Sequence, residues 1–466
     1  MTPVLPPSLS GTPGLGVLPD LKRDVLGTIE RAQRECGDVV RLDMGPPGLR
    51  STLYTIFHPD AVRRVLATEA DGYRKENRFY QELRWSLGDG LLNSQDDRWR
   101  RQRRFIQPLF TRRRIDTYAQ GMGEEAETLA PRWRDAVAAG KPIDLHAEMS
   151  RVTLRIVGRL LFGADVERAV PVVSHAFPVI GEYARLRSYA PIPFPRSWPL
   201  PANRRANRAR TAVYGICDEL IAERRAAGAT GEDLMSLLIA ARDGEEALDD
   251  AEIRDQVLIF LLAGHDTTAI ALTFALHLLG QHPAVQERVR AEANEVAGDR
   301  TPGAADVERL AYTTMVLKEA MRLYPPAWAT GRRVAAGDEL GGYAIPPGAE
   351  VMVSPWVTHR HPEFWDAPER FEPERFTPEA EAARHRHAYF PFGAGPRACI
   401  GQYFSMLEAT ILLAVIVRDH ELTSLADSVP LAPRITLHPA APVLSRLTAP
   451  ARVPRRAVRV VQGPGR

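Results

Sequence analysis

The longest hydrophobic pattern in the chain is a predicted helix in which apolar residues occupy every face. It starts at the acidic pair 249–250 and runs to about Leu279, where Gly280 and Pro283 are expected to end it. Its centre, residues 257–264, contains no polar side chain. A helix that is apolar all round is buried all round. Because its apolar stretch is too short to cross a membrane, the pattern predicts a helix through the protein core.

The rest of the chain is mostly helical, with a few short strands. Helical periodicity covers residues 20–36, 61 to about 303, and 310–323. Strand-like segments are 39–42, 53–56, 339–356 and 435–447. These patterns predict a mainly α protein with a small β region.

No linker or low-complexity run divides the chain, so residues 1–466 are predicted to form a single domain. Residues 1–20 are rich in proline and are expected to be extended, and about 452–466 are expected to form a flexible basic tail. The segment 191–201 holds five prolines, which block a helix. That segment is either a lid over a hydrophobic site or a plain surface connection.

Composition excludes several classes of protein. The formal net charge of +2 gives no general attraction to nucleic acid. Three cysteines, Cys36, Cys217 and Cys399, are too few and too scattered for a disulfide framework, which favours a reducing cytoplasm. The amino terminus lacks a signal pattern, and no apolar run of about 18 residues is seen. We therefore expect a cytoplasmic protein without a membrane anchor.

One cysteine lies in a loop with unusual chemistry, near the carboxyl end, in the sequence FPFGAGPRACIG. A thiolate held in such a loop can be the axial ligand of a haem iron. Gly395 and Gly401 are expected to let the backbone turn its N–H groups toward the sulfur of Cys399. Phe392 can cover the sulfur, and Arg397 suits a haem propionate. The alternative is a buried structural cysteine in a turn.

The predicted central helix carries a second group of chemically active residues. A charged Asp266 in an apolar helix is costly unless it has a partner or a role. Gly264, next to Ala263, leaves room for a flat cofactor or bound O2, and Thr267 can hydrogen-bond to a backbone carbonyl and open the helix locally. Asp266 and Thr267 together are suited to pass protons. The alternative is a helix kink lined by polar residues.

Both segments resemble motifs of one known family. The pattern F-x-x-G-x-R-x-C-x-G around Cys399 resembles the haem-binding loop of the cytochrome P-450 superfamily, and residues 263–268 resemble its A-G-x-D/E-T-T motif. The family's E-x-x-R motif follows at Glu319 and Arg322, and its P-E-x-F-x-P-E-R-F segment at 368–376. Motifs in this order make the resemblance specific.

The resemblance implies a cytochrome P-450 fold that holds haem b between the long central helix and the cysteine loop. It implies that Cys399 ligates the iron and that Asp266 and Thr267 are catalytic. It also implies that Arg375 joins Glu319 and Arg322 in a buried ion network. The cofactor-binding residues that it implies are Trp99, Arg103, Ala263, Gly264, Arg333, Phe392, Gly395 and Arg397.

The function implied is a monooxygenase of secondary metabolism that uses O2 and hydroxylates or epoxidises a hydrophobic small molecule (a terpenoid, fatty acid or polyketide). Electrons are expected from a separate ferredoxin or flavodoxin with its reductase, since the short stretch after Cys399 cannot hold a flavin domain. A monomer is expected. The alternatives are a non-oxygenating haem-thiolate sensor or isomerase and a haem-free helical binding protein.

Two further sets of residues are predicted from where they lie in the sequence, one for the substrate pocket and one for a partner surface. By analogy, the substrate pocket is lined by Phe79, Tyr80, Phe260, Ala263, Ala327, Trp328 and Leu444. A second set of arginines either steers an acidic partner or forms an ordinary solvated face. These are Arg98, Arg100, Arg101, Arg104 and residues 112–114.

Overall fold

The fold was analysed in a computed structural model, which describes residues 4–163, 169–188, 190, 193–228, 231, 233–243 and 246–450. The predicted flexible tail at 452–466 lies outside the described residues, as does Pro191 at the start of the proline-rich segment.

Helices make up most of the described chain, which confirms the mainly α prediction. The α-helices are α1 (Leu18–Arg23), α2 (Val25–Cys36), α3 (Pro59–Arg63), α4 (Arg78–Leu87), α5 (Asp96–Ile106), α6 (Arg112–Asp116), α7 (Ala119–Glu127), α8 (Leu129–Ala138), α9 (Leu145–Ile156), α10 (Ala169–Ser188), α11 (Pro201–Ala226), α12 (Leu234–Ala240), α13 (Asp250–Gln281), α14 (Pro283–Ala297), α15 (Ala304–Val307), α16 (Ala311–Leu323), α17 (Pro355–Thr358), α18 (Pro378–Ala383) and α19 (Gln402–Asp419). Shorter π and 3₁₀ turns are η1 (Arg64–Thr68), η2 (Ala70–Gly72), η3 (Gln107–Phe110), η4 (Val157–Leu161), η5 (Pro373–Phe376), η6 (Arg386–Ala388) and η7 (Gly395–Arg397).

The strands are short and form one larger sheet and several small ones. They are β1 (Val39–Met44), β2 (Ser51–Ile56), β3 (Tyr73–Arg74), β4 (Ile143–Asp144), β5 (Arg242–Asp243), β6 (Glu246–Ala247), β7 (Thr330–Val334), β8 (Asp338–Leu340), β9 (Tyr343–Ile345), β10 (Glu350–Val353), β11 (Glu421–Ser424), β12 (Leu431–Pro433), β13 (Leu437–Pro439) and β14 (Leu444–Thr448). The larger sheet has the order β1-β2-β10-β7-β3, with β10 parallel to β2 and the other pairs antiparallel. A second sheet has the order β11-β14-β4.

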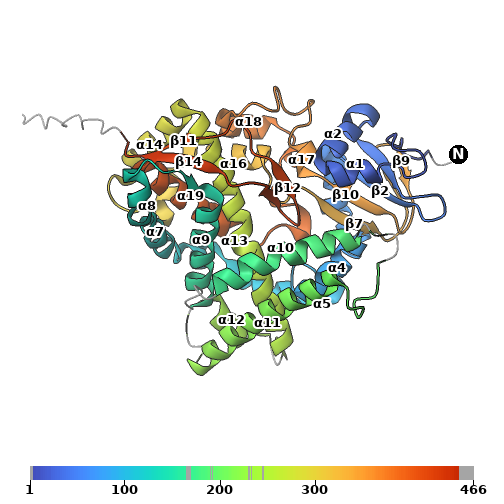
Figure 1. The fold of residues 1–466 in the computed structure, drawn as a ribbon, viewed down its shortest axis with the longest axis horizontal. Coiled ribbons are helices and arrows are strands. Elements are labelled where there is room, and N and C mark those ends of the chain that lie inside the picture. The colour runs from blue at the N-terminus through green and yellow to red at the C-terminus, as the bar shows by residue number, and fades with distance from the viewer. Residues whose placement is uncertain are drawn as a thin grey trace, which may run out of the picture.

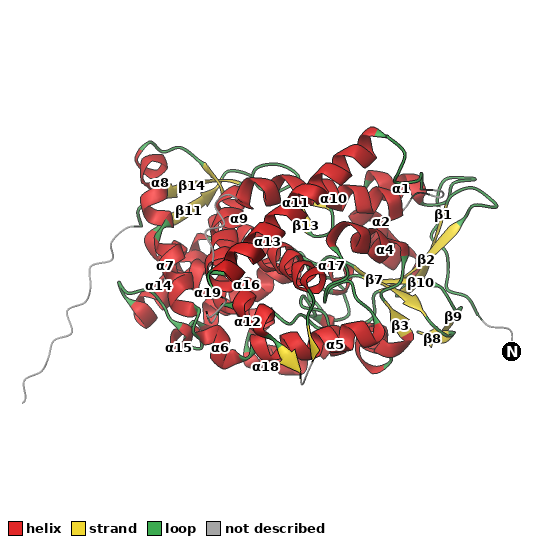
Figure 2. Ribbon diagram, turned by 90° about the horizontal axis from the view of Figure 1, so that it is seen from below, coloured by secondary structure: helices red, strands yellow, loops and turns green. Residues whose placement is uncertain are grey.

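The larger sheet and the helical body lie at opposite ends of the molecule. Figures 1 and 2 show β1, β2, β10 and β7 gathered at the end near the N-terminus, beside α1 and α2. Helix α13 passes through the helical body, where it packs against α9, α16 and α19. The second sheet lies at the far end of that body. The functional residues predicted on α13 are therefore held at the centre of the fold.

Helix α13 matches the predicted central helix closely. Asp249 forms a capping box with Glu252, in which each side chain accepts a hydrogen bond from the other residue's backbone N–H. The helix continues through Gly280 to Gln281, so Gly280 does not end it. A Cβ atom at Gly280 would lie 2.6 Å from the backbone nitrogen of Ser424. This glycine is needed for the close approach of β11.

By length and composition α13 is apolar enough to cross a membrane, and no other helix among the described residues is. We had expected its apolar stretch to be too short for that, so the expectation about length was wrong. However, 78% of its apolar window is buried inside the protein. Its hydrophobicity is therefore accounted for by the core, as predicted. Cytoplasmic location remains a prediction.

At the amino terminus, the helix expected over residues 20–36 is divided in two. Asp24 lies between α1 and α2, and its side chain accepts a hydrogen bond from the backbone N–H of Gly27 at the start of α2. Before α1, the chain is irregular and is attached to β1 through isolated bridges such as Ser8 with Arg41. The expected extended segment therefore ends at α1.

Candidate active site

One face of α13 is accessible although the helix lies in the core. Between Asp255 and Gly280, all of which the structure describes, every residue is buried except Ala263, Gly264 and Thr267. Ala263 and Gly264 are neighbours, and Thr267 lies four and three positions after them, so the three residues share one side of the helix. The accessible face coincides with the predicted oxygen-activation motif.

On this face, Thr267 carries a hydroxyl group, whereas Gly264 allows a close contact with a neighbouring segment. The Thr267 hydroxyl donates to the carbonyl of Ala263 at 2.9 Å, as its position in the motif predicted. A Cβ atom at Gly264 would meet the side chain of Val157, in η4, at 3.1 Å. The missing side chain therefore makes room for Val157, and the expectation that Gly264 also leaves room for a cofactor stays a prediction.

Asp266 is buried and has partners from another part of the chain. The Thr436 hydroxyl donates to its Oδ2 at 2.6 Å, and Nε2 of His438 lies 3.3 Å from the same oxygen. Burial alone would raise the pKa of Asp266, but His438 and Thr436 together lower it to about 2. Asp266 is therefore an ionised carboxylate at neutral pH.

The cysteine loop follows η7 and leads directly into α19. Cys399 is exposed, and its backbone N–H donates to the carbonyl of Phe392 at 2.9 Å. Gly395 has a φ of 66°, and a Cβ atom there would lie 2.1 Å from the carbonyl oxygen of Leu66. Only glycine fits there. Gly401 has a φ of −88°, which other residues also adopt, and its backbone N–H acts on the sulfur of Cys399, as expected.

The thiol of Cys399 is surrounded by groups that act on its acidity, although the residue is exposed. Burial raises the pKa of its thiol, while the N–H of Gly401 and the charge of Arg103 act in the opposite direction. These are the interactions that a thiolate would need. Arg103 also lies close to the loop, with Nη1 3.5 Å from the carbonyl oxygen of Ala398.

A direct contact joins the helix after Cys399 to α13. The hydroxyls of Thr268, on α13, and Ser405, on α19, are 2.9 Å apart. One turn further along α19, Glu408 is fully buried. Burial raises the pKa of Glu408 well above its ordinary value, and Thr268 offsets this only in part. Because Thr268 follows Thr267 and Ser405 lies six residues after Cys399, this contact brings the cysteine loop near the accessible face of α13.

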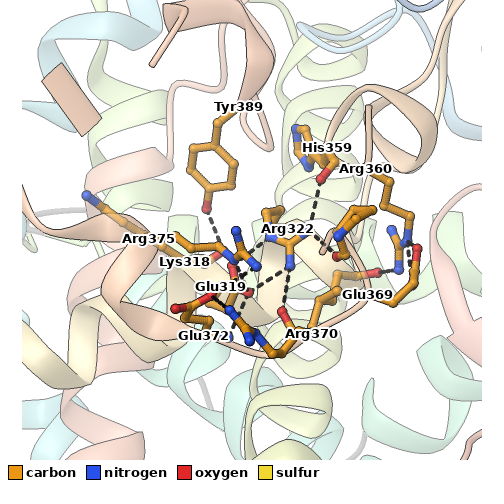
Figure 3. A network of polar contacts seen from close by, with 12 residues as sticks. Lys318, Glu319, Arg322, His359, Arg360, Glu369, Arg370, Glu372, Arg375 and Tyr389 are labelled. Carbon is orange, nitrogen blue, oxygen red and sulfur yellow. Dashed lines mark hydrogen bonds and ion pairs between the residues drawn. The ribbon is translucent and has the colours of Figure 1, made fainter. Parts of the chain in front are cut away.

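Figure 3 shows the ion network that was expected around Glu319 and Arg322, and the structure confirms it. Nε and Nη2 of Arg322 donate to the two carboxylate oxygens of Glu319 at 2.6 and 2.7 Å, and both side chains are fully buried. Nε of Arg375 lies 3.5 Å from Glu319. The backbone N–H of Glu372 also donates to Glu319, at 3.0 Å.

The network also positions the segment before the cysteine loop. Arg322 donates to the carbonyls of His359, Pro368 and Arg370 (Figure 3). Nε2 of His359 accepts a hydrogen bond from the backbone N–H of Phe390, where the loop begins. Burial, reinforced by the charge of Arg322, lowers the pKa of His359 well below its ordinary value, so the ring stays neutral and can accept.

A second cluster of charge lies around Arg397. Its guanidinium donates to the carbonyl of Ser94 at 2.8 Å and to the side chain of Gln95 at 3.1 Å. It also lies 4.1 Å from the ring centre of Trp99. Trp99 and Arg103 both belong to α5, as predicted.

Lys75, Tyr80 and Arg332 complete this cluster; the sequence assigned Tyr80 to the substrate pocket and did not single out Lys75 or Arg332. Nζ of Lys75 donates to the carbonyl of Leu92 and lies 5.1 Å from the Tyr80 ring centre. Arg332, on β7, is 6% exposed. Burial, followed by the positive charge of Arg332, lowers the pKa of Arg397 to about 10. Two buried cations, Lys75 and Arg332, therefore lie close to the partly buried Arg397.

Arg333 lies outside this cluster. Successive residues of β7 point to opposite sides, and Arg333 is exposed while Arg332 is buried. The arginine of β7 that faces the cluster is therefore Arg332, and binding of the cofactor by Arg333 stays a prediction.

This donor set fits the two propionates of a haem. Among the described residues, no ion pair reaches Lys75, Arg103, Arg332 or Arg397; their hydrogen bonds go to carbonyls and neutral side chains. Buried cations normally have anionic partners. A bound group with carboxylates next to Cys399 would supply them.

A cavity of about 480 Å³ opens beside Tyr80, between the larger sheet, α4 and α10. Phe79, Tyr80 and Trp328 line it, as predicted for the substrate pocket. Leu444 does not line it: it lies opposite Asp144 in the second sheet and is 41% exposed. Ile435, between β12 and β13, lines the cavity instead.

Residues of the predicted lid and of the predicted partner surface make contacts within this chain. In the proline-rich segment, Phe194 and Trp198 are exposed and stack at 5.5 Å, while Arg196 pairs with Glu82 of α4. Most arginines of the suspected partner surface pair with acids of this chain: Arg98, Arg100, Arg101, Arg104 and Arg112. The lid and the partner surface both stay predictions.

Comparison with known proteins agrees with this geometry. The family model "Cytochrome P450" matches residues 6–443. The chain is 40% identical to the cyclooctatin synthase of Streptomyces melanosporofaciens, over 82% of each chain. It is 34% identical to the pentalenene oxygenase of Streptomyces avermitilis, over 86% of this chain and 88% of that protein. The crystal structure of the cytochrome P450DA heme domain superposes with a TM-score of 0.86, at 28% identity, over 97% of this chain and 99% of that one. The chain therefore belongs to the cytochrome P450 family of haem-thiolate monooxygenases.

Proposed function

We propose that the protein is a haem b monooxygenase that hydroxylates a terpenoid, with Cys399 as the axial ligand of the iron. The observation that carries the proposal is the position of an exposed Cys399 beside the accessible face of α13, with buried, unpaired cations next to it. Bound there, the haem-thiolate group would supply the activation of O2.

The buried cations would hold the propionates. Arg332 and Arg397 present guanidinium groups that match carboxylates in geometry, and Lys75 and Arg103 add charge from the other segments. Trp99 would support Arg397 from the face of its ring. Phe392, Gly395 and the loop backbone would shield the sulfur of Cys399 from water.

Ala263 and Thr267 would line the oxygen-binding side. The Thr267 hydroxyl lies on the accessible face and holds its hydrogen bond within the helix, where it can redirect it to a bound ligand. Asp266, next to it, stays ionised and can accept and release a proton. This arrangement supports an oxygenating enzyme rather than a sensor or isomerase, which would not need the acid and the threonine.

Two observations support a terpenoid substrate. The relatives named for cyclooctatin and pentalenene indicate terpenoid chemistry in the similar part of the family. The cavity wall formed by Phe79, Trp328 and Ile435 is apolar, as a hydrocarbon skeleton requires. Electrons would come from a separate ferredoxin with its reductase.

The first test is an absorbance titration of the ferric protein with pentalenene, palmitate and a macrolactone. A substrate that displaces water from the iron shifts the haem from low to high spin. We expect a saturable shift with pentalenene and little or none with the other two. A shift with palmitate alone would replace the terpenoid proposal by a fatty-acid one.

A second test concerns the ligand itself. Cys399→Ser should abolish the thiolate spectrum of the reduced carbon monoxide complex, while Cys217→Ser, at a buried cysteine far along the chain, should keep it. A thiolate spectrum in Cys399→Ser would disprove the ligand assignment. Product formation with ferredoxin, reductase and O2 separates a monooxygenase from a non-oxygenating protein.

A further inference from the structure

Two histidines from distant segments form a hydrogen-bonded chain that ends at Asp266. Nε2 of His438, on β13, lies 3.3 Å from Oδ2 of Asp266. Nδ1 of His438 lies 3.4 Å from Nε2 of His146, on α9, and the two rings meet edge to face. His146 in turn reaches the Thr273 hydroxyl, about two turns along α13 from Asp266, at 3.5 Å.

The hairpin β12–β13 holds this arrangement rigidly. The Thr436 hydroxyl donates to Asp266 and lies 3.0 Å from Nε2 of His438, so both residues hold one carboxylate oxygen. The backbone N–H of Leu437 donates to the carbonyl of Pro326, and Trp328 Nε1 donates to the carbonyl of Arg434. His438 therefore follows a segment that is held at Arg434 and Leu437, and it pairs with Ala432 across the hairpin.

His438 and Asp266 are both mostly buried, and each keeps a small exposed fraction, 16% of the His438 side chain and 12% of the Asp266 side chain. On the side of the β12–β13 hairpin, Asp266 is contacted by Thr436 and His438. Among the described residues, His438 is the only ion-pair partner of Asp266. A proton that reaches Asp266 from this side has to pass the imidazole or the Thr436 hydroxyl.

We propose that His438, with His146 as its next hydrogen-bonding partner, delivers protons from solvent to Asp266 during oxygen activation. The proposal rests on the proposed monooxygenase function. In the step, the Nε2 proton of the protonated His438 moves to Oδ2 of Asp266, which gives a neutral imidazole and a carboxylic acid. Solvent returns a proton to His438, and Asp266 passes its own proton on toward the accessible face. One proton enters for each proton that leaves.

Histidine is suited to this role because it is the side chain that gains and loses a proton near neutral pH. A lysine or arginine would pair with Asp266 equally well but would keep its proton. The titratable groups that face the chain are His265, beside Asp266 on α13, and Asp144, which acts on His146 from the start of α9. Burial lowers the pKa of His146 to about 4, so this ring is mostly neutral and can accept a hydrogen bond from His438.

Three variants separate proton delivery from simple charge pairing. His438→Gln removes both charge and proton exchange. His438→Lys keeps a positive charge but cannot release its proton near neutral pH. His277→Gln is the matched control. His277 is a buried histidine of α13, the helix that carries Asp266, and it hydrogen-bonds to Ser424, far from Asp266.

The first readout is the infrared absorption of protonated carboxyl groups in the holoenzyme at pH 6, with Asp266→Asn to identify the Asp266 band. A band from the neutral Glu408 is expected in every variant. We expect no Asp266 band in the wild type, in His438→Lys or in His277→Gln, and a new band in His438→Gln. If His438→Gln shows no such band, His438 does not control the charge of Asp266 and the proposal is wrong.

The second readout is the product formed per pair of electrons consumed, with pentalenene as the probe, ferredoxin and reductase as the electron source, and peroxide release as the competing outcome. We expect a loss of at least about 10-fold in both His438→Gln and His438→Lys, and none in His277→Gln. Full product formation in His438→Lys would overturn the proposal, because charge pairing would then be sufficient. If the wild type forms no product from any probe, the monooxygenase function fails, and with it delivery during oxygen activation. The infrared result would still show separately whether His438 sets the charge of Asp266.

Discussion

The protein contains two clusters of buried charge connected to the cysteine loop, and they balance their charge differently. Glu319 and Arg322 form a bidentate ion pair, and Arg322 makes further bonds to backbone carbonyls. Arg332 and Arg397 form no ion pair with a carboxylate among the described residues. One cluster is complete in itself, whereas the other needs an anionic partner.

This difference separates residues that maintain the fold from residues that bind a ligand. A buried charge without a partner is expensive, so a protein keeps several of them only where something else pays that cost. By the same reasoning, the complete cluster around Arg322 has no remaining capacity to bind anything. The pKa shifts do not make the distinction, because burial shifts the pKa of groups in both clusters.

The largest expected effect is at the complete cluster. Arg322→Leu leaves the Glu319 carboxylate buried without its bidentate partner, and such a change costs about 3–5 kcal/mol of the free energy of unfolding. Urea unfolding followed by circular dichroism measures it. Arg100→Ala, which removes an exposed pair with Asp97, is the control and should cost less than about 1 kcal/mol. Equal costs at the two sites would mean that the buried network does not hold the fold.

At the cluster around Arg332 and Arg397, the effect of a substitution on the protein should depend on whether haem is bound. Arg332→Met removes a buried cation, so the haem-free protein should become slightly more stable. The same change should weaken haem binding by about 10- to 100-fold, since a charge-assisted hydrogen bond is lost. Thermal unfolding of the haem-free form and haem transfer to a competitor protein measure the two effects.

The adjacent Arg333→Met is the control for that experiment. Arg333 lies on the exposed side of β7, so neither stability nor haem retention should change appreciably. The assignment of Arg332 would be refuted if Arg333→Met lost haem and Arg332→Met kept it.

The contrast between Arg332 and Arg333 also shows what could be predicted from the sequence. The central helix, the cysteine loop and the Glu319–Arg322 pair depend on local spacing, which the sequence displays directly. The side to which a strand residue points depends on register, and a slip of one residue reverses every side chain. The sequence of β7 offers two adjacent arginines, and only its pairing with β10 identifies the buried one.

Contacts between distant segments could not be predicted from the sequence either, because they depend on how the whole chain folds. Lys75 and Tyr80 belong to no distinctive motif, and they join Arg397 only because the chain folds back. The partner of Asp266 lies 170 residues away in Thr436. Leu444 and Ile435 both follow the predicted pattern of apolar strand positions, and nothing local shows which one reaches the cavity.

A pH experiment tests the incomplete cluster without a ligand. Burial lowers the pKa of Lys75 to about 8, from an ordinary value of 10.5. Below about pH 8 the folded haem-free protein therefore carries the full cost of a buried ammonium group, and this cost disappears as the pH rises toward 10.5. The free energy of unfolding should increase by about 1 kcal/mol between pH 8 and pH 10 after allowance for partial solvation.

Lys75→Met is the matched variant for this measurement. Its stability should already be higher at pH 7 and should vary less between pH 8 and pH 10, with any remaining slope arising from Tyr80, whose pKa Lys75 and Arg332 lower to about 8 against the effect of burial. Bound haem should flatten the wild-type profile too, because propionates would keep Lys75 charged. An unchanged slope in Lys75→Met would show that Lys75 is not the titrating group.

The smallest expected effect concerns the wall of the cavity. Ile435→Ala removes apolar surface that lines the cavity next to Trp328, whereas Leu444→Ala removes a half-exposed side chain from the second sheet. In the spin-shift titration with pentalenene we expect the dissociation constant to rise by about 3- to 10-fold for Ile435→Ala and to stay unchanged for Leu444→Ala. Since Ile435 is adjacent to Thr436, which holds Asp266, Ile435→Ala should also raise peroxide release slightly. A larger effect from Leu444→Ala would mean that the substrate binds on the other side of the β12–β13 hairpin, away from the cations that this comparison assigns to ligand binding.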